Sequence, residues 1–450
     1  MQLDSERRNF DSLGGMLKLI IPIFIELLLQ VLVGNIDQMM LSNFNQDSVG
    51  AVANANTILN VFMLVFTMIS LATTIIASQF IGAGRKDKVE EVYSVSVFMN
   101  IAFGLLISVM LVALHRPLFS LMRMDARFWD DAGSYMVIVG GFSFLQSLYL
   151  TYTAIFRSKR MMNVTMFVSM AMNVVNVIFN YILIYGLWIF PAMGVAGAAI
   201  ATVLSRVAGV VTLMIIYRRR MPEKIRLRYM RPFPKDMLKR LLAIGLPSAG
   251  ESFSYQLSQA VLLSVINGFG ADSTNAKAYC AIIVQFSYLY CIAVSQAAQI
   301  CVGYHVGARE YDKADKLTKR LIMTSIVVTA ICTTSIYLLH PTILSWFGVS
   351  APVMALCGQV LMIDIVLEMG RSFNSVFIRA LQGSGDVRYP IIIGILAMWI
   401  ISVGLGCFFG IVLGWGLAGV WLGMTLDECS RGIIFAFRWK SGIWKQKTLI

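Results

Sequence analysis

Long apolar runs alternate with short polar segments along the whole chain. A helix that crosses a bilayer needs about 20 apolar residues in succession, and twelve runs in this sequence are close to or above that length. The predicted spans are residues 16–40, 52–79, 92–114, 131–156, 162–187, 193–217, 241–267, 276–302, 321–339, 352–379, 389–412 and 415–437. The pattern therefore predicts an all-α integral membrane protein with twelve transmembrane helices.

The first span carries polar residues along one face. Glu26, Gln30, Val33 and Asp37 are spaced i, i+4, i+7 and i+11, which places them in one stripe of a helix. A carboxylate at the bilayer centre costs roughly 2.5–3.5 kcal/mol, so it must face a cavity or a partner. We expect this stripe to line an internal cavity. The alternative is a buried hydrogen-bonded pair that only stabilises helix packing.

Composition and charge support the membrane assignment and give it a direction. Hydrophobic residues make up 58% of the chain and charged residues 14%, against about 25% charged in soluble domains. With the N-terminus in the cytoplasm, the inner connections hold 30 of the 37 Lys and Arg residues and the outer loops hold 4. This bias predicts a multi-pass protein of the plasma membrane, the inner membrane of a prokaryote, with both termini cytoplasmic. The net charge of +13 then reflects these loops, in contact with membrane lipid, and indicates no nucleic-acid partner.

Several short motifs occur twice. The paired segments are 22–26 and 247–251, 81–88 and 306–313, each 225 residues apart, and 194–197 and 416–419, 222 residues apart. Each repeat contains six spans, an even number, so both halves enter the membrane the same way up and are related by an axis along the membrane normal. We predict an N-lobe over 1–220, a basic cytoplasmic linker over 221–240 and a C-lobe over 241–450. Two such lobes are typical of a transporter that rocks about a central site.

The N-terminal half offers a candidate cation site. Asn176 and Asn180 share a face of the fifth span, Thr202 lies in the sixth, and Asp37 supplies a carboxylate. Na⁺ prefers such oxygen ligands, and an aspartic acid in an apolar cavity can instead carry a proton. The alternative is that the Asn and Thr side chains only bond helix to helix, at about 0.6 kcal/mol each.

The C-terminal half contains a second polar set. Glu251 and Tyr255 share a face of the seventh span, and Asp364, Glu368 and Arg371 follow one face of the tenth. Asp427, Glu428 and Arg431 lie together in the twelfth span. Buried arginines require acidic partners, and any acid left over could carry a proton or hold a cationic substrate. Structural ion pairing is an equal alternative for these residues.

No catalytic motif is visible, so the sequence predicts neither an enzyme nor a cofactor other than a coupling cation, H⁺ or Na⁺. The seven cysteines lie almost entirely within apolar runs and form no CxxC pair. They are typical of small buried hydrophobic residues and not of a disulfide framework or metal site.

The combination of motifs resembles the multidrug and toxic compound extrusion (MATE) transporters. The segments that carry the resemblance are PIFIELLLQVLVGNIDQMM (22–40), SQFIGAGRKDK (78–88), GVAGAAIAT (194–202), GYHVGAREYDK (303–313) and LQGSGD (381–386). The resemblance covers nearly the whole chain. It implies a V-shaped pair of six-helix lobes around a central cavity, exporting organic cations in exchange for Na⁺ or H⁺.

The resemblance also implies roles for particular residues. One branch of the family uses an N-lobe site that Asp37, Asn176 and Thr202 match, while Asn180 stands where that branch has an aspartate. Another branch has an essential acid on the seventh span at the place of Tyr255, and here Glu251 lies one turn earlier. On the tenth span Arg371 replaces the usual acid, and Glu368 lies one turn before it.

The sequence therefore predicts a secondary active antiporter, a monomer, that exports organic, cationic amphipathic compounds. One alternative is a flippase of the same superfamily for a lipid-linked saccharide or another lipid, although acids outnumber arginines within the spans. Others are a transporter of one specific metabolite and a receptor or scaffold that transports nothing.

Overall fold

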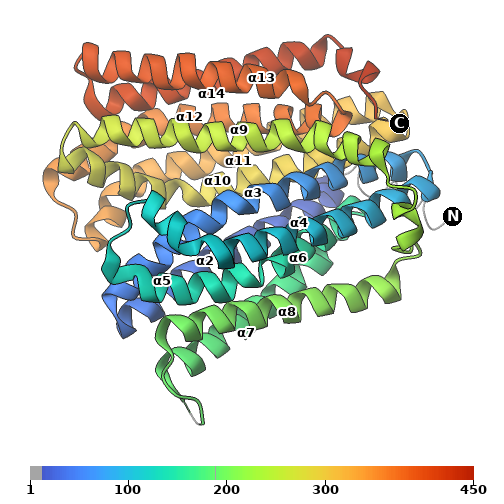
Figure 1. Cartoon of the computed structure of the whole chain (residues 1–450). Coiled ribbons are helices and arrows are strands. Elements are labelled where there is room, and N and C mark those ends of the chain that lie inside the picture. The colour runs from blue at the N-terminus through green and yellow to red at the C-terminus, as the bar shows by residue number, and fades with distance from the viewer. Residues whose placement is uncertain (1–12, 188, 450) are drawn as a thin grey trace. The chain divides into compact units, whose positions relative to one another are not determined.

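The computed structural model describes residues 13–187 and 189–449, and within these ranges the chain forms helices and no strands (Figure 1). The helices of the first half are α2 (Leu13–Phe44), α3 (Gln46–Gly82), α4 (Lys86–Leu121), η1 (Ala126–Phe128), α5 (Trp129–Tyr135), η2 (Met136–Gly140), α6 (Ser143–Ser158), α7 (Met162–Tyr185) and α8 (Gly194–Arg220). Those of the second half are η3 (Leu227–Met230), α9 (Lys235–Asn267), α10 (Ala271–Gly307), α11 (Tyr311–Trp346), α12 (Ala351–Ser384), α13 (Arg388–Ala397), η4 (Met398–Leu405), η5 (Phe408–Val412), α14 (Gly416–Lys440) and η6 (Ile443–Gln446).

Each of the twelve predicted spans coincides with a helical segment. Among the described residues, nine helices are long and apolar enough to cross a membrane, or ten if the bent pair α5–η2 and α6 counts as one span. The remaining two segments are α9 and α14, which are 33 and 25 residues long and contain several charged residues. The predicted all-α membrane architecture is confirmed.

The fourth span differs from the continuous helix predicted over 131–156. The segments Ala126–Gly140 and Ser143–Ser158 meet at an angle of 46°. The last turn before the bend, η2, is a π-helix, and Gly140 and Gly141 follow each other at the break. A π-turn followed by two glycines interrupts the regular hydrogen-bond ladder, which explains the bend.

The internal repeat is visible in the backbone of the turns. Three pairs of residues 225 positions apart have a left-handed conformation, Gly84 and Arg309, Arg123 and Gly348, and Arg160 and Gly385. Each is followed by a residue whose N–H donates to the carbonyl five residues earlier, for example Arg85 to Phe80 (3.0 Å) and Glu310 to His305 (2.8 Å). These are helix C-caps of the Schellman type. The glycine motifs at 81–88 and 306–313 therefore form tight turns between consecutive helices.

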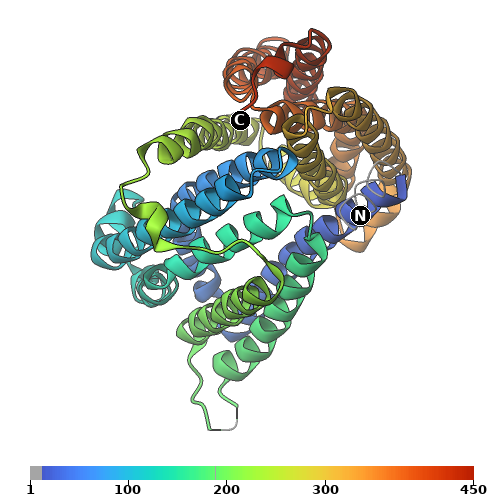
Figure 2. The ribbon, with the colours of Figure 1, turned by 90° about the vertical axis from the view of Figure 1, so that its right-hand side faces the viewer.

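Contacts divide the chain into two compact units. The N-unit contains residues 25–81 and 85–249, and the C-unit contains the chain from residue 250 onward, residues 82–84 and the start of α2 as far as Phe24. Figure 2 shows the helices of each unit from near their ends. Each unit has its own apolar core, around Phe66 and Leu111 in the N-unit and around Cys357 and Val420 in the C-unit. The boundary after Ala249 lies within α9, and the lobes 1–220 and 241–450 stay a prediction.

The left-handed turns give a stability prediction. Gly84 has a φ of 72°, and no atom lies within 4 Å of the place that a Cβ would take, so Gly84→Ala adds backbone strain without a clash. We expect this change to lower the free energy of unfolding by about 1–2 kcal/mol, measured by thermal unfolding of the purified protein. The reverse change at the repeat-related position, Arg309→Gly, relieves the same strain and should leave the melting temperature equal or higher. Equal melting of wild type and Gly84→Ala would contradict this account.

Candidate functional site

The predicted N-terminal cluster forms around the carboxylate of Asp37 on α2. Asn180 Nδ2 on α7 donates to Asp37 Oδ1 at 2.6 Å. The Asn176 amide faces Asp37 as well, and the orientation that satisfies its hydrogen bonds places its nitrogen 3.0 and 3.2 Å from Oδ1 and Oδ2 of Asp37. The two asparagines lie one turn apart and are buried, with 6% and 1% of their surfaces exposed. The i, i+4 spacing on α7 therefore directs both amides at one acid.

Thr202, the fourth predicted residue, does not bond directly to Asp37. Its hydroxyl donates to Ala198 O within α8 at 2.9 Å. The buried Tyr135 on α5 has the Thr202 side chain beside its hydroxyl and Asp37 as an electrostatic neighbour. Tyr135 belongs to this cluster but could not be recognised from the sequence, because an aromatic residue at the start of the fourth span resembles an ordinary core or interface residue.

The Asp37 carboxylate has no cationic partner. No Lys, Arg or His in the part of the chain that the structure describes lies within ion-pair distance of it. The Asn180 Oδ1 atom is buried and has no hydrogen-bond partner among these residues. In this geometry the amides donate to an ionised carboxylate. If the amide of one asparagine rotates by 180° about χ2, it presents its oxygen in place of its nitrogen. An oxygen is the ligand that Na⁺ requires.

Glu26, in the same predicted stripe, has a different environment. Its carboxylate is 1% exposed and receives Arg157 Nη2 at 3.0 Å and Thr165 Oγ1 at 3.1 Å. Gln30, one turn further along, is exposed. The two acids of the stripe therefore differ. The charge of Glu26 is compensated by Arg157, whereas the charge of Asp37 has no cationic partner among the described residues. Arg157 was not recognised as a partner, because the sequence places it in a cytoplasmic connection.

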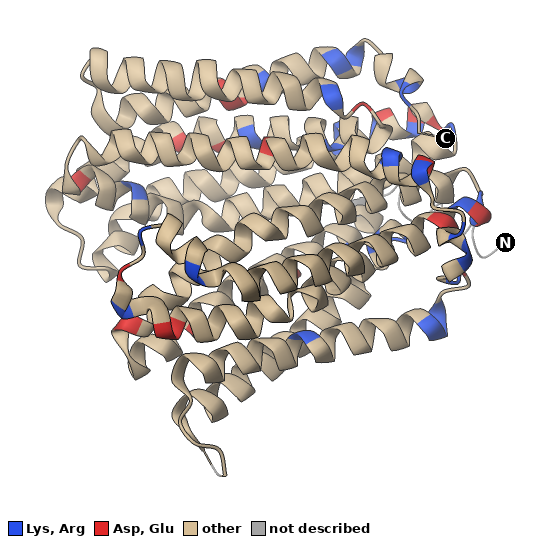
Figure 3. Ribbon diagram, in the orientation of Figure 1, with Lys and Arg blue, Asp and Glu red and all other residues tan. Residues whose placement is uncertain are grey.

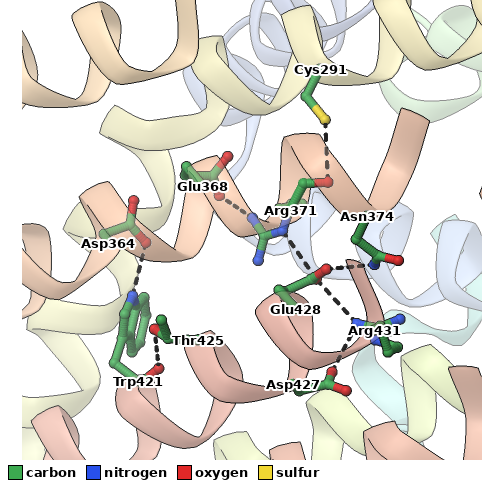
Figure 4. A network of polar contacts seen from close by, with 10 residues as sticks. All are labelled: Cys291, Asp364, Glu368, Arg371, Asn374, Trp421, Thr425, Asp427, Glu428 and Arg431. Atoms are coloured by element: carbon green, nitrogen blue, oxygen red, sulfur yellow. Dashed lines mark hydrogen bonds and ion pairs between the residues drawn. The ribbon is translucent and has the colours of Figure 1, made fainter. Parts of the chain in front are cut away.

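The C-unit contains a network of ion pairs between α12 and α14 (Figure 4). Arg371 contacts Glu368 on its own helix and Glu428 Oε1 on α14, the latter at 3.3 Å. Arg431 Nη2 lies 2.8 Å from Asp427 Oδ2 and 3.2 Å from Glu428 Oε1. Asn374 Nδ2 donates to Glu428 Oε2 at 2.7 Å. Both arginines predicted to pair with acids therefore do so.

Acids exceed arginines in this network. Trp421 Nε1 donates to Asp364 Oδ1 at 2.9 Å, but Asp364 Oδ2 and Glu368 Oε2 are buried without a hydrogen-bond partner among the described residues. A buried carboxylate oxygen with no partner is costly. These two oxygens are consequently places where a proton or a cation would lower the free energy of the cluster.

Glu251 on α9 is the repeat-related counterpart of Glu26 but lacks its ion pair. At the position equivalent to Arg157, 225 residues later, the chain has the neutral Gln382. No hydrogen bond or ion pair of Glu251 is found in residues 13–187 and 189–449. Its carboxylate packs against Gly394 of α13, since Oε1 lies 3.4 Å from the place where that glycine would carry a Cβ. The electrostatic neighbours of Glu251 are Arg379, Arg431 and Glu428. Tyr255, one turn along α9, has Arg371 and Glu428 as electrostatic neighbours.

The fold and the charged clusters within its helices define a polytopic membrane transporter. The MatE family model matches residues 22–182 and 247–408, so its two copies begin at the two prolines of the internal repeat. The chain belongs to this family, the MATE transporters, and it is a membrane transporter and not an enzyme.

Relatives and solved structures agree with this assignment. The uncharacterized transporter YisQ of Bacillus subtilis (strain 168) is 36% identical over 441 residues, 98% of this chain and 97% of the relative. The probable multidrug resistance protein NorM of Thermotoga maritima is 24% identical over 97% of this chain and 94% of the relative. A crystal structure of MATE in the bent conformation aligns with a TM-score of 0.88 at 22% identity, covering 96% of each chain.

The Glu26–Arg157 pair gives a prediction for a structural role. Arg157→Met leaves a carboxylate that is 1% exposed without its cation, and we expect a loss of about 3–5 kcal/mol in stability. The double variant Glu26→Gln/Arg157→Met removes both charges and should recover most of that loss. Thermal unfolding of the two variants in one detergent measures the difference. A double variant as unstable as Arg157→Met would contradict the pairing.

Proposed function

We propose that this transporter is a secondary active antiporter that exports organic small molecules in exchange for H⁺ or Na⁺. The observation that carries the proposal is the Asp37 carboxylate, which lies within a membrane span, bonded to two asparagines and paired with no cation among the described residues. Ionisable residues in such places mark function by default. Asp37, Asn176, Asn180 and Thr202 are the proposed coupling site, and Tyr135 completes its surroundings.

Coupling requires that the ion favours one conformation of the transporter. A ligand shifts a conformational equilibrium only by its difference in affinity for the two states. We propose that cation or proton binding at Asp37 repositions α2, in which Pro22 removes one backbone hydrogen bond and weakens the helix. Crystal structures of MATE in the bent and in the straight conformation support the idea that this fold has two conformations.

The C-unit acids support a second role within the same proposal. The unpartnered oxygens of Asp364 and Glu368, and the unpaired Glu251, are candidates for holding a cationic substrate or a second coupling ion. The name of the Thermotoga relative, a probable multidrug resistance protein, supports export of drug-like amphipathic compounds. A transporter of one specific metabolite with the same coupling site is the remaining candidate.

The charge distribution supports an orientation with both termini in the cytoplasm. Within each unit, most Lys and Arg residues gather at one end of the helices (Figure 3). Arg218, Arg219 and Arg220 form the last turn of α8, and Arg438 and Lys440 lie in the last turn of α14. An excess of positive residues marks the cytoplasmic side. We therefore expect a plasma-membrane protein with both termini in the cytoplasm, and we propose separately that it acts as a monomer.

Transport in proteoliposomes tests the proposal directly. A fluorescent organic cation is loaded, and Na⁺ and pH gradients are imposed separately. We expect one of the two gradients to accelerate efflux, because the site binds a single positive charge. Efflux that responds to neither gradient would remove antiport from consideration.

Asp37→Asn should lower gradient-driven efflux by at least about tenfold, because the amide removes the negative charge that binds the cation. Asp47→Asn is the matched control, since Asp47 is exposed and its carboxylate lies 3.7 Å from the equally exposed Arg127. We expect this control to transport like the wild type. Normal coupled efflux by Asp37→Asn would assign the coupling site elsewhere.

Asn180→Asp tests the identity of the ion. Asn180 Nδ2 lies 2.6 Å from Asp37 Oδ1, so the substitution places a second carboxylate beside the first. The added negative charge and oxygen ligand should strengthen Na⁺ binding relative to the wild-type site. The stimulation of efflux by an imposed Na⁺ gradient should therefore increase several-fold. This corresponds to a gain on the order of 1 kcal/mol in the free energy of Na⁺ binding. The measurement is the Na⁺ concentration for half-maximal efflux, and an unchanged value would contradict direct coordination at this position.

A further inference from the structure

The N-unit contains a small cavity whose lining does not include Asp37. Its volume is about 50 Å³, and it lies between α3, α4, α6 and α8. Phe66, Ile107 and Leu111 form buried apolar walls. The polar residues of the lining are Arg206 of α8, Asn56 and Asn60 of α3, and Ser143 of α6. A guanidinium beside apolar walls is poorly screened, so its attraction for an anion is stronger than at an aqueous surface.

Arg206 differs from Arg371 and Arg431, which also lie within predicted spans, in having no acidic partner among the described residues. Arg371 and Arg431 each contact carboxylates. Among the residues that the structure describes, Arg206 forms no ion pair, and its electrostatic neighbour is the hydroxyl of Tyr135. An unpaired arginine within a span is costly. Helix packing alone does not explain its presence, whereas an anion that binds there would compensate the charge.

The chemistry of the cavity fits a carboxylate. Arginine presents several N–H groups in a planar fork that matches a carboxylate with two parallel hydrogen bonds. Asn56 and Asn60 lie one turn apart on α3 and can add amide donors. The volume suits one small anionic group and not a whole drug-sized molecule, so the rest of a larger ligand would lie outside the cavity.

The internal repeat supports a specialised role for this position. The residue equivalent to Arg206, at the 222-residue spacing of the last helices, is Glu428, which lies in the acidic network of the C-unit. The two units thus carry opposite charges at equivalent positions. In the sequence Arg206 lies one turn after Thr202 in the sixth span, and no acid at i±3 or i±4 suggests a partner for it.

We infer that the cavity around Arg206 binds the carboxylate group of the transported compound, with Asn56 and Asn60 as further donors. The substrate class is then zwitterionic amphipathic molecules, which carry a carboxylate in addition to the positive charge expected from the sequence. This inference rests on the proposed export function for its biological meaning, but the anion site itself is a binding property that can be measured separately.

Binding to the full-length purified protein tests the inference. The probes are a rhodamine with a free carboxylate and its methyl ester, which share one fluorophore and differ in the negative charge. Fluorescence polarisation gives the dissociation constant of each dye. We expect wild type to bind the free-carboxylate dye about tenfold more tightly than the ester, the range of a charge-assisted hydrogen bond.

Arg206→Met should abolish this preference and leave the affinity for the ester within about twofold, because it removes the charge and keeps an apolar side chain of similar length. Its melting temperature should equal or exceed that of the wild type, since an unpaired charge is removed. Arg206→Gln replaces it if the Met variant does not fold. Competition by sodium acetate that depends on Arg206 would support a site that also accepts a free small anion.

Wild type that binds both dyes equally would overturn the inference, as would an Arg206→Met variant that weakens both dyes by the same factor. Transport of the same dyes in proteoliposomes separates this result from the export proposal. Arg206-dependent preference in binding, with movement of neither dye, would retain the anion site and reject the export function. Efflux of the ester, with no preference for the free-carboxylate dye in binding, would retain the export function and reject the anion site.

Discussion

The free-energy cost of an ionised side chain within the apolar thickness of a bilayer constrains this whole structure. The protein meets that constraint in two places and leaves it unmet in two others. Glu26 is compensated by Arg157, and the acids of α12 and α14 surround Arg371 and Arg431. Asp37 and Arg206, in contrast, have no partner of opposite charge in the described part of the N-unit. Compensated charges stabilise the helix bundle, and uncompensated charges are where ions or substrate groups can bind.

The twofold repeat explains how compensated and uncompensated charges arise from one pattern. Left-handed turns at Gly84 and Arg309, and at Arg160 and Gly385, preserve the backbone of both halves. Individual side chains have diverged on that backbone, so that Glu26 has an arginine partner while Glu251 has Gln382 at the equivalent place. Differences between equivalent positions therefore indicate function more sharply than either half does alone.

Much of the architecture could be predicted because it depends on local signals. Apolar runs long enough to cross a bilayer gave the twelve helical segments, and the i, i+4 spacing of Asn176 and Asn180 placed both amides on one acid. The bend at Gly140, the pairing of Glu26 with Arg157 and the approach of Tyr135 to Asp37 could not be predicted, since each depends on contacts between helices distant in sequence. The different surroundings of Glu26 and Asp37 could not be predicted either, because residue spacing shows that the two acids share a helix face but not which side chains lie opposite them.

The central claim is that Asp37 exchanges one positive charge with its surroundings while the neighbouring asparagines hold it in place. Infrared difference spectroscopy of the reconstituted protein tests it most directly, by comparing wild type with Asp37→Asn during pH changes and on addition of Na⁺. The account predicts a carboxylate band that changes under one of these two conditions in wild type and is absent from the variant. Identical difference spectra for the two proteins under both conditions would contradict it.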